Sequence, residues 1–246
     1  MNHKNYCVEL TRLLTTGFSP AGFHITNDIE LDPVPENANY AALTFGLNEH
    51  RIVFRKGKVT PDRPGAFLAI WQRPSPQLVS IDASDMALSD IKSNKKPIPL
   101  NAEQLDYLFI EVHSYPDGSG LAEGSYLAEG SDLAEGSGLA DGAVLAEGSD
   151  LAKASRSEVV NKLERGMFIF PVSLLIKKGI VCGGKSKGKN GFRVFPPWSQ
   201  DRGKVGTQVF SDSGKKTQRW QLPYFVSIDE NGLIDPAKLN SLISSN

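Results

Sequence analysis

The sequence has little that would cross-link the chain or anchor it in a membrane. Its 246 residues include two cysteines, Cys7 and Cys182, without the Cys-x-x-Cys or Cys/His spacing that a zinc site requires. No window approaches the roughly eighteen apolar residues of a membrane-spanning helix. The N-terminal segment MNHKNYCVELTRLL lacks the apolar run and cleavage site of a secretory signal. These absences predict a cytoplasmic protein with reduced thiols and no membrane partner.

Motifs of nucleophilic and nucleotide-binding sites are also missing. The four histidines have no serine or cysteine partner that spacing suggests, so no catalytic triad can be assigned. The glycine-rich segment 183–189, GGKSKGK, lacks the GxxxxGK[ST] spacing and the strand–loop–helix context of a phosphate loop. We therefore expect no cofactor, and we interpret this segment as a basic loop that contacts phosphates.

A metal-dependent nuclease would need two or three carboxylates that hold Mg²⁺ and a lysine near the attacking water. The usual arrangement places an acidic residue two positions before a lysine on a strand, and no predicted strand contains this pair. Asp82, Asp85 and Glu111 remain as candidate ligands of Mg²⁺, and catalytic residues are otherwise unassigned. The sequence favours binding without catalysis, with cleavage as the alternative.

What the sequence does contain is a basic segment interleaved with aromatic residues. Residues 177–219 hold eleven lysines and arginines and two aspartates, a net charge of +9 in a chain whose net charge is −1. Phenylalanine and tryptophan side chains alternate with these charges, a combination that suits a polyanion with flat rings, and nucleic acid is the obvious candidate. The alternative interpretation is a solvated basic face whose aromatic residues point into the core.

In the nucleic-acid interpretation, lysines neutralise phosphates and give an affinity that falls with salt. Arginines form bidentate contacts to phosphate or guanine, tryptophans stack on bases, and the amides of Gln218 and Gln221 read a base edge. The residues that we assign to nucleic-acid binding on this basis are Lys185, Lys187, Lys189, Arg193, Trp198, Lys215, Lys216, Gln218, Arg219 and Trp220.

The hydrophobic pattern predicts strands and helices without strict alternation. The predicted strands cover 40–46, 51–56, 66–73, 107–113 and 167–170, and the predicted helices cover 3–16, 172–179 and the segment that follows Asp235. Gly17 is expected to end the first helix, and strands 51–56 and 66–73 are expected to pair antiparallel across Gly57–Gly65. This order indicates an α+β fold with a mixed β-sheet flanked by helices.

Between these elements the chain repeats a six-residue unit, LAEGSx, six times within 114–156. As a helix, this period turns successive leucines by about 120° and gives no continuous apolar stripe. As a strand it is rich in poor strand formers, and as a hexapeptide β-helix it would form only two coils. We therefore interpret 114–156 as a disordered, acidic insertion. We hypothesise that it competes with nucleic acid for the basic face.

Three segments outside the repeat carry a family resemblance. They are FRKGKVTPDRPGAFLAIWQRP at 54–74, GMFIFPVSLLIKKGI at 166–180, and GFRVFPPWS with TQRWQLPYF between 191 and 225. Together they resemble the MepB family of small bacterial cytoplasmic proteins, over roughly residues 40–112 and 165–226. The resemblance implies a fold similar to type II restriction endonucleases and nucleic-acid binding, with cleavage unsettled.

The same resemblance adds Arg55, Lys58 and Arg73 to the candidate nucleic-acid contacts. Two features depart from the family pattern. The family usually shows Trp-Lys-Arg where this chain has Trp71-Gln72-Arg73, and the repeat is foreign to it.

We predict a single domain, made of 1–113 and 157–246 and interrupted by the repeat. It is expected to bind nucleic acid, DNA rather than RNA, without catalysis. The alternatives are a Mg²⁺-dependent nuclease and a stress or drug-response interaction protein whose basic face is only solvated surface. The sequence leaves the oligomeric state and the cellular pathway open.

Overall fold

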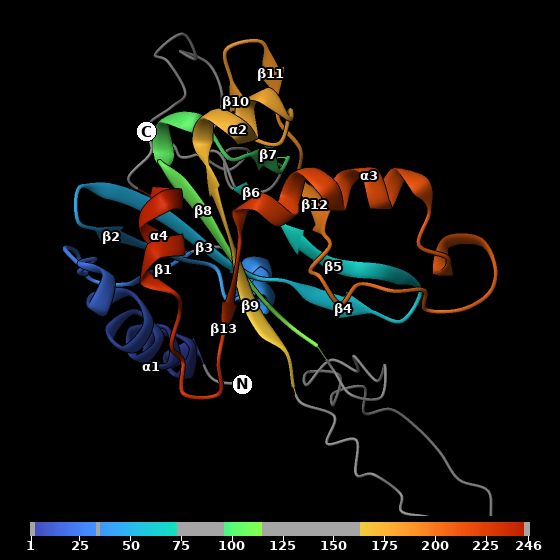
Figure 1. Cartoon of the computed structure of the whole chain (residues 1–246). Coiled ribbons are helices and arrows are strands. Elements are labelled where there is room, and N and C mark those ends of the chain that lie inside the picture. The colour runs from blue at the N-terminus through green and yellow to red at the C-terminus, as the bar shows by residue number, and fades with distance from the viewer. Residues whose placement is uncertain (1–2, 33–34, 73–95, 115–162, 244–246) are drawn as a thin grey trace, which may run out of the picture.

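Apolar and β-branched runs form a six-stranded mixed sheet in the computed structural model, which describes residues 3–32, 35–72, 96–114 and 163–243 (Figure 1). β3 and β8 run parallel, and the other neighbouring strands run antiparallel. In spatial order the strands are β1 (Glu30–Leu31), β2 (Leu43–Leu47), β3 (His50–Lys56), β8 (Tyr107–His113), β9 (Arg165–Pro171) and β13 (Phe225–Ile228).

β8 and β9 are the buried centre of this sheet. The sequence YLFIEVH of β8 is almost uniformly apolar and buried up to Val112, as expected for a strand that is covered on both faces. β8 pairs with β9 from Tyr107 opposite Pro171 to His113 opposite Arg165. The parts of the chain before and after residues 115–162 therefore contribute adjacent strands to one sheet.

One face of the sheet packs against helices from both ends of the chain. Alternation along β8 directs Tyr107 and Phe109 to this face and Leu108 and Ile110 to the other. The Tyr107 hydroxyl donates to Ile243 O at 2.6 Å, which fixes the last helix on the sheet. Figure 1 shows α1 and α4 together on this side. The elements are α1 (His3–Leu13), the π-helical turn η1 (Leu14–Phe18), η2 (Ser19–Ala21) and α4 (Pro236–Ile243).

The opposite face is covered by a smaller sheet and two helices. The smaller sheet has the order β12 (Gly191–Val194), β5 (Arg63–Ala69), β4 (Lys58–Thr60), and the helices are α2 (Val172–Lys177) and α3 (Asp212–Gln221). Two short antiparallel strand pairs, β6 (Trp71–Gln72) with β7 (Ile98–Pro99) and β10 (Cys182–Gly183) with β11 (Ser186–Lys187), lie beside them. Single 3₁₀ turns complete the described chain: η3 (Pro35–Tyr40), η5 (Ala102–Gln104), η6 (Gly206–Gln208) and η7 (Leu222–Tyr224).

The predicted mixture of helices with a mixed sheet is confirmed. Strands occupy the predicted segments near 43–47, 50–56, 107–113 and 165–171. The terminal helix begins as expected, because Asp235 Oδ1 accepts from Ala237 N at 2.9 Å and Pro236 is the first helical residue. Gly179, just past α2, has φ +67°, the left-handed conformation that favours glycine at a helix end.

Two local predictions are wrong. Gly17 does not end the first helix, which continues as η1 to Phe18. Gly17 instead allows close packing, because a Cβ at this position would lie 2.8 Å from Gly232 O. Strands β3 and β5 do not pair, because β3 lies between β2 and β8 while β5 pairs with β4 and β12 in the smaller sheet.

Two sequence predictions lie wholly or almost wholly outside the described residues: the disorder of 114–156, and Asp82 and Asp85 as candidate ligands of Mg²⁺. The similarity to restriction endonucleases stays a prediction. Within the described ranges, no helix is long and apolar enough to cross a bilayer.

Candidate nucleic-acid interface

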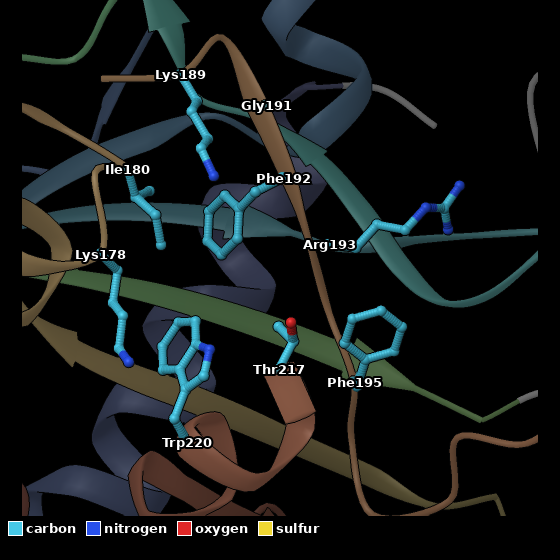
Figure 2. A pocket seen from close by; sticks show the side chains of 9 residues that line it. All are labelled: Lys178, Ile180, Lys189, Gly191, Phe192, Arg193, Phe195, Thr217 and Trp220. Carbon is cyan, nitrogen blue, oxygen red and sulfur yellow. The ribbon is translucent and has the colours of Figure 1, made fainter. Parts of the chain in front are cut away.

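A cavity of about 350 Å³ lies where β12, α3 and the chain around α2 meet (Figure 2). Its lining combines cations, aromatic rings and a hydroxyl, and it includes no carboxylate. The lining residues are Lys178, Ile180, Lys189, Gly191, Phe192, Arg193, Phe195, Thr217 and Trp220. The structure therefore brings together three predicted contacts, Lys189, Arg193 and Trp220, from two separate elements and a loop.

Two glutamine side chains fasten α3 to β12 and so fix the shape of the cavity. Gln221 is fully buried, accepts from Phe195 N at 2.8 Å and donates to Arg193 O at 3.0 Å. One turn earlier, Gln218 donates to Pro196 O at 2.9 Å. Both amides are engaged by backbone groups, so we withdraw them from the set of base-reading side chains.

The aromatic part of the cavity rests on the core. The rings of Phe192 and Trp220 each contact Phe170 of β9, with centroid separations of 6.5 and 5.6 Å. Figure 2 shows both rings directed into the same space from β12 and α3. Because Phe170 is fully buried, these two half-buried rings form a fixed apolar floor rather than a mobile surface.

Two ammonium groups stand beside this floor. Lys178 Nζ lies 4.8 Å from the ring centroid of Trp220, and Lys189 points its amine toward Phe192 in Figure 2. The backbone of the loop is tied down, since Lys189 N donates to Ile180 O at 2.9 Å. Among the described residues, no carboxylate forms an ion pair with either lysine. Both charges are therefore available to an anion.

Arg193 occupies the other end of the cavity and is half-buried. Its Nη2 donates to Thr60 Oγ1 at 2.8 Å, and its guanidinium lies 5.8 Å from the ring centroid of Phe67. Burial lowers the pKa of Arg193, and the positive charges of Arg63 and Arg202 lower it further, against the opposing effect of Asp62. Even so the group stays charged at neutral pH.

Five more predicted contacts of the basic segment project into solvent. Lys185, Lys187, Lys215, Lys216 and Arg219 are exposed, and none forms an ion pair with a described residue. Lys216 precedes Trp220 by four residues on α3, so the two share one side of the helix. Lys58 is half-buried, with Nζ 5.3 Å from the ring centroid of Tyr40, and desolvation lowers its pKa.

Two further predicted contacts, Arg55 and Trp198, are engaged by the fold. Arg55 is 1% exposed, and its Nη2 pairs with Asp32 Oδ2 at 3.1 Å, so the guanidinium stabilises the interior instead of reaching a phosphate. Desolvation lowers the pKa of Arg55 to about 10, and the carboxylate of Asp32 opposes this. Trp198 is half-buried and packs edge-on against Phe225 at 5.6 Å. Arg73 lies outside the described residues.

Glu111 is a structural anchor. Its buried carboxylate accepts from Arg165 Nε at 2.7 Å, lies 3.0 Å from His113 Nε2, and has Lys56 Nζ 3.7 Å away. Burial would raise the pKa of Glu111, but the hydrogen bond of His113 and the charges of Lys56 and Arg165 outweigh it and hold the pKa at about 2. A metal ion would have to replace these bonds. In the described part of the chain, no three His, Cys, Asp or Glu side chains are grouped to hold a metal ion.

Comparisons with known proteins identify the family. The model of the MepB-like family matches residues 34–88 and 150–227, more than half of the chain. The chain belongs to the MepB-like family. It is also similar to a crystal structure of MepB, with 23% identity, a TM-score of 0.45, and coverage of 84% of this chain and 87% of that chain. No curated protein matches it.

The family match spans every residue that lines the cavity and leaves out α1 and α4. The cavity of this MepB-like protein also includes Lys178, Phe192 and Thr217, to which the sequence assigned no role. A signal for Lys178 existed, since a cation next to Gly179 at the end of α2 must project outward. No sequence signal placed Thr217 in a cavity, because its position depends on how α3 docks.

Replacing Gln221 with leucine should loosen the cavity. The substitution leaves the buried Phe195 N–H without its acceptor, which costs about 2 kcal/mol or more of unfolding free energy. Gln218→Leu is the matched control, since it removes only a half-buried bond and should cost about 1 kcal/mol or less. Urea unfolding at neutral pH measures both, and equal losses would contradict the role assigned to Gln221.

Glu111→Gln should destabilise this MepB-like protein without involving any metal ion. Because the folded-state pKa of about 2 lies below the ordinary 4.5, the carboxylate stabilises the fold above pH 4.5, and this contribution is lost as the pH falls toward 2. At neutral pH the variant should lose about 3 kcal/mol. Its unfolding free energy should also depend less steeply on pH between 5 and 2 than that of the wild type.

Glu9→Gln is the control for this measurement, because Glu9 binds the same lysine, Lys56, at 2.7 Å from an exposed position. It should cost no more than about 1 kcal/mol. A Glu111→Gln protein as stable as the wild type across this pH range would show that the carboxylate is not the anchor described above.

Proposed function

We propose that this protein binds nucleic acid through the cavity and the exposed cations around it. The single observation that carries the proposal is the combination in one cavity of Phe192 and Trp220 with Lys178 and Lys189, and with no carboxylate in the lining. A ring floor beside ammonium groups that pair with no described carboxylate fits a ligand that is both flat and anionic. Nucleic acid is the polyanion that offers such rings.

The surrounding charges support a polymer rather than a small anion. The hairpin β10–β11 supplies Lys185 and Lys187, and α3 supplies Lys215, Lys216 and Arg219, in addition to the two lysines of the cavity. Exposed lysines without acidic partners neutralise successive phosphates and release counterions, which gives an affinity that depends on salt but little on sequence. We take DNA as the first ligand to test.

No observation favours cleavage. Glu111, one of the three candidate nuclease carboxylates, is engaged by Arg165 and His113, and the other two, Asp82 and Asp85, lie outside the described residues. Binding without catalysis is therefore the function that the geometry supports best. The proposal includes a cytoplasmic location, because nucleic acid, the proposed ligand, is found in the cytoplasm.

The double substitution Lys215→Gln/Lys216→Gln should weaken binding and reduce its salt dependence. Each lost phosphate contact lowers the slope of log affinity against log salt by about 0.7 to 0.9, so the slope should fall by about 1 to 2. Fluorescence anisotropy with labelled single-stranded and duplex DNA at several salt concentrations, with and without Mg²⁺, measures the slope. The DNA is checked for cuts afterwards.

Arg12→Gln removes one charge from α1 on the opposite face, and should leave the slope unchanged. Wild-type binding without salt dependence would overturn the proposal and favour a protein partner. DNA cleavage that requires Mg²⁺ would overturn the part of the proposal that excludes catalysis.

A further inference from the structure

Three arginines lie on segments that meet beside one end of the cavity. Arg193 belongs to β12, Arg63 opens β5, and Arg202 lies in the loop between β12 and α3. Figure 2 shows the guanidinium of Arg193 directed away from the aromatic end, where Trp220 and Lys178 lie. None of the residues Arg63, Arg202 or Asp62 belongs to the cavity lining, so this arginine cluster is a second feature next to it.

Hydrogen bonds hold the three segments in place. Arg193 Nη2 donates to Thr60 Oγ1 at 2.8 Å, which joins β12 to the end of β4. Thr207 Oγ1 donates to Asp62 O at 3.1 Å, and Arg202 N donates to Gln208 O at 2.8 Å. The loop that carries Arg202 is thereby attached to the β4–β5 turn that carries Arg63.

Charge in this cluster is not balanced. Asp62 Oδ2 lies 3.3 Å from Arg63 Nε, and no other described carboxylate pairs with any of the three arginines. Three guanidinium groups against one carboxylate leave an excess of two positive charges. Burial is the main cause that lowers the pKa of Arg193, and repulsion from Arg63 and Arg202 lowers it further, against the opposing effect of Asp62.

A donor in the cluster also lacks an acceptor. Arg202 Nε is buried and has no hydrogen-bond partner. A buried N–H without an acceptor is costly, and structures normally satisfy such groups. A ligand oxygen placed among the three guanidinium groups would balance the excess charge, and a small shift of the half-buried Arg202 side chain would let its Nε donate to that oxygen.

We propose that the cluster of Arg63, Arg193 and Arg202 binds the terminal phosphate of a nucleic-acid strand. This inference rests on the proposed function and names the part of the ligand that is recognised. A terminal phosphate monoester carries a charge of about −1.5 to −2 at neutral pH and three acceptor oxygens. An internal phosphodiester offers a single charge and two free oxygens. The excess of two charges and the planar donors of arginine match the monoester.

The position of the cluster relative to the rings agrees with this choice. Arg193 lines the cavity at one end and Phe192 and Trp220 line it at the other. A terminal nucleotide whose base contacts the rings would hold its phosphate at the arginine cluster. The rest of the strand would then follow the exposed lysines.

The test compares one internally labelled single strand in three forms, with a 5′-phosphate, with a 3′-phosphate, and with hydroxyls at both ends. Fluorescence anisotropy at fixed salt should show about tenfold tighter binding for one of the phosphorylated forms. A strand longer by one nucleotide is the electrostatic control. It adds one diester charge but no terminal phosphate, and its affinity should change less than twofold.

Arg202→Gln should abolish the preference for the phosphorylated end while salt-dependent binding persists. Lys204→Gln is the matched control, because it removes one charge from the same loop at an exposed position and should keep the preference. Thermal melting establishes that both variants fold, and Arg63→Gln replaces Arg202→Gln if the latter does not.

Each outcome decides between the two proposals. Salt-dependent binding with no preference for either phosphorylated end overturns the terminal-phosphate inference and leaves the proposed function standing. Equal losses of preference in Arg202→Gln and Lys204→Gln also overturn it, because bulk charge would then be the cause. Absence of salt-dependent binding to all strands overturns the proposed function and this inference with it.

Discussion

The pairing of β8 with β9 is the interaction on which the rest of this structure depends. These two strands are the buried centre of the sheet, and they join the parts of the chain on either side of residues 115–162. β3 is aligned on β8 and β13 on β9, so an error in this pairing would displace both halves of the sheet. The polar groups inside the pair need partners, which is why Glu111 of β8 meets Arg165 of β9.

The geometry of the cavity also depends on the pairing of β8 with β9. β9 passes through Pro171 directly into α2, which ends beside Lys178, while α3 continues through η7 into β13 on the other edge of β9. Phe170 of β9 supports both rings of the cavity floor. The hydrogen bonds of Gln221 then fix the position of β12 relative to α3. The core therefore holds the rings in place, whereas packing does not fix the exposed lysine side chains around them.

Local sequence patterns predicted most strands and the terminal helix, because period and capping are properties of neighbouring residues. The pairing of strands was harder to predict from the sequence. β3 and β5 are close in sequence, yet they pair with different strands, because long-range packing determines which strands become neighbours. The same limit applies to single side chains. Arg55 and Gln218 are polar residues in a basic, aromatic-rich context, and only the positions of Asp32 and Pro196 show that both are structural. Lys189, Arg193 and Trp220 converged as the charge pattern indicated.

The cations of this protein form two groups that differ in burial and in ion pairing. Arg55 and Arg165 are buried or partly buried and bind carboxylates, and such pairs are screened little by salt. The cations around the cavity are mostly exposed, and none pairs with a described carboxylate except Arg63 with Asp62. Their mutual repulsion disfavours the compact state, although the hydrogen bond from Arg193 to Thr60 and the contact of Lys178 with the Trp220 ring offset part of it. Raising the salt concentration should therefore leave the fold intact while weakening any contact to a polyanion. In the described part of the chain, most of these cations thus stand beside a rigid ring floor without an ion-paired carboxylate.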